Sequence, residues 1–152
     1  MPPLQEEIHQ TTFRNECHKA AINVIFTGNW LTSEHSRFLK DFNVSEQQFN
    51  ILRILRGQGG KPASINLLKE RMLDKMSDVS RLVERLRLSG FVERSICEYD
   101  RRAVEVIITK QGLALLERID ARADEIDKMM SALTEEELRF LNFLLDKVRS
   151  RT

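Results

Sequence analysis

The sequence predicts a mainly α-helical fold: a winged helix-turn-helix with a short β-hairpin wing, flanked by long N- and C-terminal dimerisation helices. The centre of the chain joins a short helix, a tight link and an amphipathic helix, which is a helix-turn-helix outline. Directly after Gly90 the apolar period changes from 3.6 to 2, as where a helix gives way to a hairpin. Helical spacing returns at Thr109 and continues almost to the end.

Composition agrees with one small, packed domain. The 152 residues are 41% hydrophobic and 31% charged, which suits a soluble core. No apolar run approaches the roughly 20 residues of a membrane span, and the first residues lack the basic start and apolar segment of a signal peptide. We therefore expect a cytoplasmic protein that does not contact membranes, with Cys17 and Cys97 as free thiols.

The N-terminal third is expected to be helical. Apolar residues recur at helical spacing over residues 12–42, which predicts one long helix, bent near Gly28 because a mid-helix glycine is unfavourable. Ser45 and Gln48 match a capping box and open a second helix that runs into the "GQGGKP" loop at residues 57–62.

The helix-turn-helix follows this loop. Residues 63–65 predict a very short strand, and Asn66 is the expected N-cap of a helix over residues 67–72. The next helix spans residues 77–89 and ends at Gly90, a residue typical of helix C-termini. Its apolar residues recur at i, i+3, i+4 and i+7, which predicts one buried face; they are Val79, Leu82, Val83 and Leu86.

Two alternating segments, residues 91–96 and 103–108, predict a β-hairpin with the polar tip "CEYDRR". Thr109 then caps a fifth helix, in which apolar residues repeat as heptads from Gly112 to Leu133. Thr134 and Glu137 match a second capping box and open a last helix, apolar around more than half of its circumference.

These terminal helices carry more apolar surface than a helix-turn-helix of about 45 residues can cover. We expect a single domain in which residues 1–44 and 109–152 form a helical dimerisation region and residues 45–108 form the winged helix. A second copy of the chain would then cover the apolar faces. The alternative is that the terminal helices pack only on one another within one chain.

Charge is unevenly distributed. Residues 61–102 hold 10 Lys and Arg against 7 Asp and Glu, a net +3, whereas the rest of the chain holds 14 against 16, a net −2. A basic centre favours contact with a polyanion. The helix over residues 77–89 would read base edges in the major groove, and the arginine-tipped wing would follow the minor groove, with Asp100 holding one wing arginine in position. The expected DNA contacts are Lys75, Ser77, Asp78, Ser80, Arg81, Arg85, Arg101 and Arg102.

Three segments resemble the multiple-antibiotic-resistance (MarR) regulators, a family of bacterial transcription factors: "VSEQQFNILRIL", "KERMLDKMSDVSRLVERLRLSGFVER" and "YDRRAVEVIITKQGLALLE". The resemblance implies a homodimer that binds a pseudo-palindromic operator, with its recognition helix at residues 77–89 and its wing arginines at Arg101 and Arg102. The chain departs from many relatives at Leu73 and Asp74, which leaves the geometry of the turn open.

The resemblance also implies a small aromatic effector, for which Trp30, Asn50 and Arg53 are residues of the right type. We therefore predict a DNA-binding transcriptional regulator, a repressor released by such a ligand. Two alternatives stay open: a winged helix used for protein–protein contact, and a thiol-based redox sensor that acts through Cys17. No nucleophile–base pair, metal-ligand spacing or phosphate-binding glycine motif occurs, so we expect neither catalysis nor a cofactor.

Overall fold

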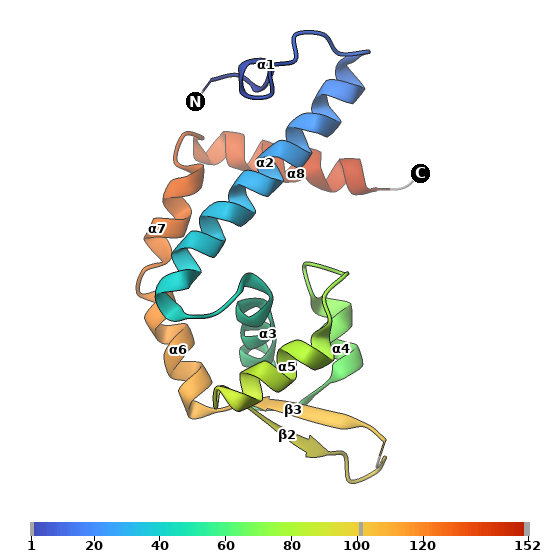
Figure 1. Cartoon of the computed structure of the whole chain (residues 1–152), viewed down its shortest axis with the longest axis vertical. Coiled ribbons are helices and arrows are strands. Elements are labelled where there is room, and N and C mark those ends of the chain that lie inside the picture. Colours follow the sequence, from blue (N-terminus) through green and yellow to red (C-terminus); the bar gives the residue numbers. More distant parts are fainter. Residues whose placement is uncertain (1, 101, 151–152) are drawn as a thin grey trace. The chain divides into compact units, whose positions relative to one another are not determined.

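The computed structural model describes residues 2–100 and 102–150 (Figure 1). The predicted fold class is confirmed: the chain is mostly helical, with a small antiparallel sheet in a winged helix-turn-helix. It divides into two compact units, residues 1–46 and 47–152. Each unit is described in turn.

The first unit contains α1 (Leu4–Glu7), α2 (Glu16–Leu39) and the 3-10 helix η1 (Lys40–Phe42). The predicted long helix is present but begins four residues later than expected, because the Asn15 side chain caps it by accepting from the His18 N–H at 2.9 Å. Helix α2 runs through Gly28 without interruption. Helix α1 was not predicted from the sequence.

The second unit opens with α3 (Glu46–Gly57), β1 (Ala63–Ser64) and α4 (Ile65–Arg71). The loop and the short strand agree with the prediction, but Asn66 as the N-cap of α4 was wrong. Ser64 is the cap: its hydroxyl accepts from the Leu67 N–H at 3.1 Å. Asn66 lies inside the first turn instead.

Helix α5 (Val79–Leu88) is the predicted recognition helix, two residues shorter than expected at its N-terminus. Its C-terminus is a Schellman motif around Gly90, which has φ +79°. The Gly90 N–H donates to the Arg87 carbonyl and the Phe91 N–H to the Leu86 carbonyl, both at 3.0 Å. The left-handed conformation favours glycine, so the predicted helix end is confirmed.

The hairpin consists of β2 (Val92–Ile96) and β3 (Val104–Ile108). Within the described residues, the sheet has the order β1–β3–β2 and is antiparallel throughout, with Val92 opposite Ile108 and Ile96 opposite Val104. The core of this unit lies between the sheet and the helices; its fully buried side chains include Leu52, Leu55, Leu68, Val83, Leu86, Val106 and Leu116.

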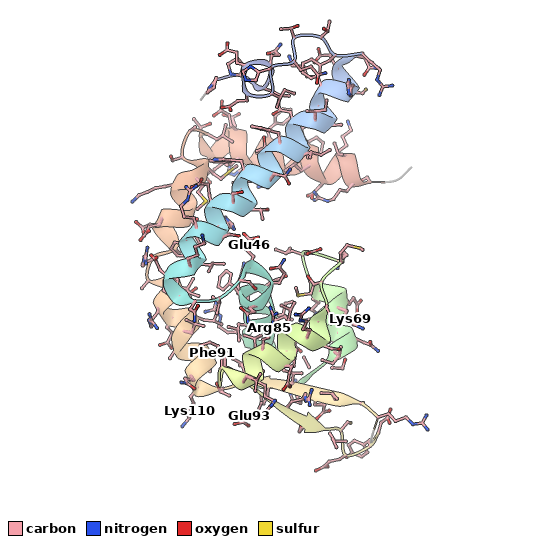
Figure 2. The ribbon with its side chains drawn as sticks, viewed as in Figure 1. Glu46, Lys69, Arg85, Phe91, Glu93 and Lys110 are labelled. Carbon is pink, nitrogen blue, oxygen red and sulfur yellow. The ribbon has the colours of Figure 1, made fainter. Side chains whose placement is uncertain are left out.

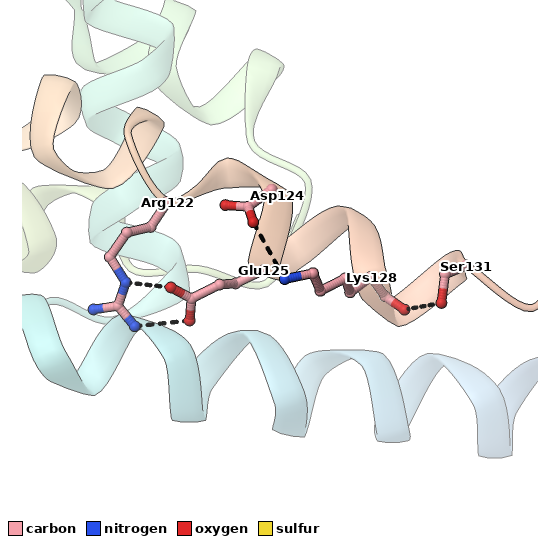
Figure 3. A network of polar contacts seen from close by, with 5 residues as sticks. All are labelled: Arg122, Asp124, Glu125, Lys128 and Ser131. Carbon is pink, nitrogen blue, oxygen red and sulfur yellow. Dashed lines mark hydrogen bonds and ion pairs between the residues drawn. The ribbon is translucent and has the colours of Figure 1, made fainter.

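The predicted continuous heptad helix after the wing was wrong. Thr109 does cap α6 (Lys110–Asp120), but the chain then breaks into α7 (Ala123–Asp127) and the 3-10 helix η2 (Lys128–Met130). At the break, the Arg122 guanidinium donates hydrogen bonds to both carboxylate oxygens of Glu125 at 2.6 and 2.8 Å (Figure 3). Lys128 forms an ion pair with Asp124 at 3.3 Å (Figure 3).

Helix α8 (Glu135–Arg149) opens with the predicted capping box between Thr134 and Glu137. None of its residues is buried among the described residues, and Phe140, Phe143 and Val148 are 60%, 57% and 77% exposed. The second unit by itself therefore leaves these apolar side chains of α8 uncovered. Among the described residues, the helices are all too short or too polar to cross a bilayer.

Candidate nucleic-acid interface

The link between α4 and α5 is held by a set of local hydrogen bonds. The Asn50 side chain on α3 accepts from the Leu73 N–H at 2.9 Å, and the Asp74 carboxylate accepts from the Met76 N–H at 2.9 Å. Asp78 is the N-cap of α5 and accepts from the Arg81 N–H at 3.2 Å. These bonds fix the approach of the chain to the recognition helix.

Helix α5 has one buried face and one cationic face. Val79, Val83 and Leu86 are buried in the core of the second unit. Arg81 and Arg85 are exposed, and Figure 2 shows Arg85 extending from α5. The sequence predicted this division correctly. When apolar residues recur at helical spacing on one face, the residues at the other positions of the helix point to solvent.

Glu84 separates the arginines of this region into two groups. Its carboxylate binds Arg87 one turn along α5 at 2.8 Å and Arg94 on β2 at 3.5 Å. The hydrogen bond from Arg87, together with the charges of Arg87 and Arg94, holds the pKa of Glu84 below its usual value. Within the described part of the chain, Arg81 and Arg85 have no such carboxylate partner, so their guanidinium groups remain available to a ligand.

A second set of bonds joins the end of α5 to the start of α6. The Thr109 hydroxyl donates to the Gly90 carbonyl at 2.7 Å and accepts from the Gly112 N–H at 3.0 Å. The Thr109 N–H donates to the Phe91 carbonyl at 3.0 Å. We call these contacts the Thr109 clasp. The clasp joins two motifs of the sequence: "SGF" supplies the Gly90 and Phe91 carbonyl groups, and "TKQG" supplies Thr109 and the Gly112 N–H.

The wing tip is shaped by Asp100. Its carboxylate accepts from the Arg102 N–H at 2.9 Å, and its carbonyl accepts from the Ala103 N–H at 2.9 Å. Its contact with Arg102 is therefore to the backbone, which sets the turn and leaves Arg102 exposed. Arg101, the other predicted wing arginine, lies outside the described residues.

The remaining predicted contacts differ in accessibility. Ser80 is exposed in the first turn of α5. The Lys75 ammonium donates to the Glu70 carbonyl near the end of α4, a favourable position for a cation. The Ser77 hydroxyl oxygen is buried and has no hydrogen-bond partner among the described residues. Among the predicted DNA contacts that the structure describes, Ser77 therefore differs in that its hydroxyl oxygen points into the protein.

The predicted ligand residues are distributed over both units. Trp30 is partly buried on α2, in the first unit. On α3, in the second unit, Arg53 lies over the Phe49 ring at 5.7 Å from its centroid, and Asn50 anchors the link to α5. That anchoring role was missed, because nothing in the local sequence connects residue 50 to residue 73. Cys17 is exposed on α2.

Among the described residues, no three His, Cys, Asp or Glu side chains lie close enough together to bind a metal ion.

The features that point to a ligand are the cationic face of α5 and the wing beside it. Both belong to the second unit. Helix-turn-helix proteins that bind duplex DNA place such a cationic helix in the major groove.

Comparison with known proteins identifies the family. The MarR family model matches residues 44–104. An uncharacterised helix-turn-helix regulator of Bacillus subtilis, YfiV, is 31% identical over 117 residues, which are 72% of this chain and 71% of that protein. The chain belongs to the MarR family. The transcriptional repressor IacR of Pseudomonas putida is another relative, 28% identical over 78% of this chain and 75% of its own length.

Solved MarR proteins share the fold. A MarR transcription factor from Planctomyces limnophilus is 26% identical with a TM-score of 0.70, over 89% of this chain and 98% of its own. The Escherichia coli MarR C80S mutant, solved with operator DNA, has a TM-score of 0.79 at 23% identity, over 92% of this chain and 100% of its own. These MarR relatives are transcription regulators rather than enzymes.

Proposed function

We propose that this MarR protein is a homodimeric transcriptional repressor that binds a pseudo-palindromic DNA operator and is released by a small aromatic ligand. The observation that carries the DNA-binding part is the pair Arg81 and Arg85, exposed on α5 and without a carboxylate partner among the described residues. Two neighbouring arginines, Arg87 and Arg94, are paired with Glu84, whereas Arg81 and Arg85 are left to bind phosphates or base edges.

In the proposed complex, the N-terminal half of α5 enters the major groove. Arg81 and Ser80 contact base edges, and Arg85 contacts a phosphate. Asp78 keeps a second carboxylate oxygen for a cytosine amine, while Arg102 follows the minor groove, where negative potential is concentrated. Lys75, Ser77 and Arg101 complete the predicted contact set, Ser77 after a small shift of its side chain.

The apolar side chains that stay exposed on α8 support the homodimer, because a second copy of the chain could cover them. A dimer would place two recognition helices on half-sites about one helical turn, ~10 base pairs, apart.

The effector class rests on solved neighbours. DNA binding by BpsR of Bordetella bronchiseptica is regulated by 6-hydroxynicotinic acid, and the organohalide-sensing regulator RdhR was solved with 2,4-dichlorophenol bound. A thermal-shift screen of aromatic acids and phenols is the direct search for the effector of this chain. A compound that binds should also weaken the complex with operator DNA.

The DNA-binding proposal is tested with Arg81→Ala, measured by fluorescence anisotropy on a duplex that the wild-type protein has selected from a random pool. We expect at least about a fivefold loss of affinity, since a good arginine–base contact contributes about 1–3 kcal/mol. Arg85→Ala should instead reduce the magnitude of the slope of log affinity against log salt concentration by about 0.9, the value for one lost phosphate contact. Arg14→Ala, an exposed arginine before α2, is the control. Equal affinities of all four proteins would contradict the proposal.

A further inference from the structure

Two large apolar side chains stand out from the link that precedes the recognition helix. Met76 is 92% exposed and Leu73 is 83% exposed. Soluble domains expose single apolar side chains routinely, but these two lie three residues apart in a segment whose backbone is fixed. The Leu73 N–H is held by Asn50 and the Met76 N–H by Asp74, each at 2.9 Å. The fold therefore presents both side chains outward in a defined place.

Resting on the proposed function, we propose that Met76, supported by Leu73, recognises thymine by packing on its C5 methyl group in the major groove. The thymine methyl is the apolar group that the base pairs present in that groove. Met76 lies two residues before the cap of α5, so insertion of the helix N-terminus brings it to the same groove as Ser80 and Arg81. Its flexible thioether side chain adapts to a small apolar target.

The charges around the two side chains favour DNA as the occupant. Lys75 lies between them in the chain, and Arg81 follows in the first turn of α5. Asp74 and Asp78 lie in the same segment, but each accepts from a backbone N–H, and neither forms an ion pair with Lys75 or Arg81 among the described residues. A duplex supplies phosphates for these cations beside the base edges. The same insertion thus covers the apolar side chains and neutralises the basic ones.

The test is a double-mutant cycle on the selected duplex. Each thymine of one half-site is replaced in turn by deoxyuridine, which removes only the methyl group. For the wild-type protein, one replacement should weaken binding about fourfold, the value of one buried methyl group. Met76→Ala should weaken binding to the thymine duplex by at least the same factor and should no longer respond to that replacement. Met76→Leu should keep the response.

Leu88→Ala is the matched control. Leu88 is 71% exposed at the opposite end of α5, and its removal should leave the thymine response as in the wild type. The inference is overturned if Met76→Ala keeps the wild-type pattern, if the selected half-site contains no thymine, or if Met76→Ala changes the molecular mass of the DNA-free protein. A wild-type protein that selects no duplex at all would instead contradict the proposed function.

Discussion

At the scale of single residues, the winged helix contains a glycine at which even a methyl side chain would clash with its neighbours. Gly112 is the clearest case: a Cβ at this position would collide with the Phe91 carbonyl oxygen and lie 2.7 Å from the Ile108 side chain. Its N–H is also the donor that the Thr109 hydroxyl accepts. The glycine of "TKQG" is therefore needed for close packing of the first turn of α6 against Phe91 and Ile108, and not for an unusual backbone angle.

We expect Gly112→Ala to lower the free energy of unfolding by about 1–3 kcal/mol, because an added methyl group in a packed junction forces its neighbours apart. Urea denaturation followed by circular dichroism measures the change. Gly28→Ala is the control with the opposite sign: a Cβ at Gly28 meets nothing within 4 Å. Alanine inside α2 should therefore stabilise the protein by up to about 1 kcal/mol. A stability of Gly112→Ala equal to the wild type would refute the packing argument.

At the scale of elements, the sequence predicted most features that local chemistry determines, although not the cap of α4, and it missed the contacts between elements. The buried face of α5, its end at Gly90, the hairpin and the capping box of α8 all follow from spacing and side-chain type. The break between α6 and α7 does not, because the heptad pattern runs through it and neither Gly nor Pro marks it. The contacts of Asn50 with Leu73 and of Glu84 with Arg94 join different elements, over 23 and 10 residues of sequence, which helical or strand periodicity does not reveal.

The capping box of α8 gives a pH-dependent prediction. The backbone and hydroxyl hydrogen bonds from Thr134 hold the pKa of Glu137 below its ordinary value of 4.5. A group whose pKa is lowered by folding stabilises the fold above its unfolded pKa and loses that effect as the pH falls through the folded pKa. Glu137→Gln should therefore be less stable than the wild type at neutral pH.

The difference between wild type and Glu137→Gln should shrink once the pH falls below about 4.5. Thermal unfolding at pH 7 and at a series of acidic pH values measures it. Glu136→Gln changes the same charge in the same turn but lies outside the capping box, and serves as the control. A difference that stays constant down to the lowest pH would show that the carboxylate is not responsible.

At the scale of the whole molecule, the main open feature is the set of apolar side chains on α8 that have no covering surface. Phe140 and Phe143 stack at 6.4 Å between ring centroids, and both remain more than half exposed. The opposite side of α8 carries ion pairs from Arg139 to Glu135 and from Arg149 to Asp146. A helix with one polar and one apolar side fits a partner surface on its apolar side, which agrees with the homodimer proposed above.

Phe143→Asp should convert the proposed dimer into monomers of 17.7 kDa, because a carboxylate in an apolar interface loses its hydration without a partner. Light scattering coupled to size-exclusion chromatography measures the mass. Asn142→Asp adds the same charge to the polar side of α8 and should leave the mass at twice that value. A wild-type protein that already elutes as a monomer would contradict the dimer, whatever the variants do.

The Thr109 clasp has a mechanical consequence. Since Thr109 is bonded to Gly90 at one side and to Gly112 at the other, we expect the residues that end α5 and the first turn of α6 to move together. In the proposed dimer, the distance between the two recognition helices would then depend on the orientation of α6. We therefore expect a compound that reorients α6 to change that distance without contacting the DNA.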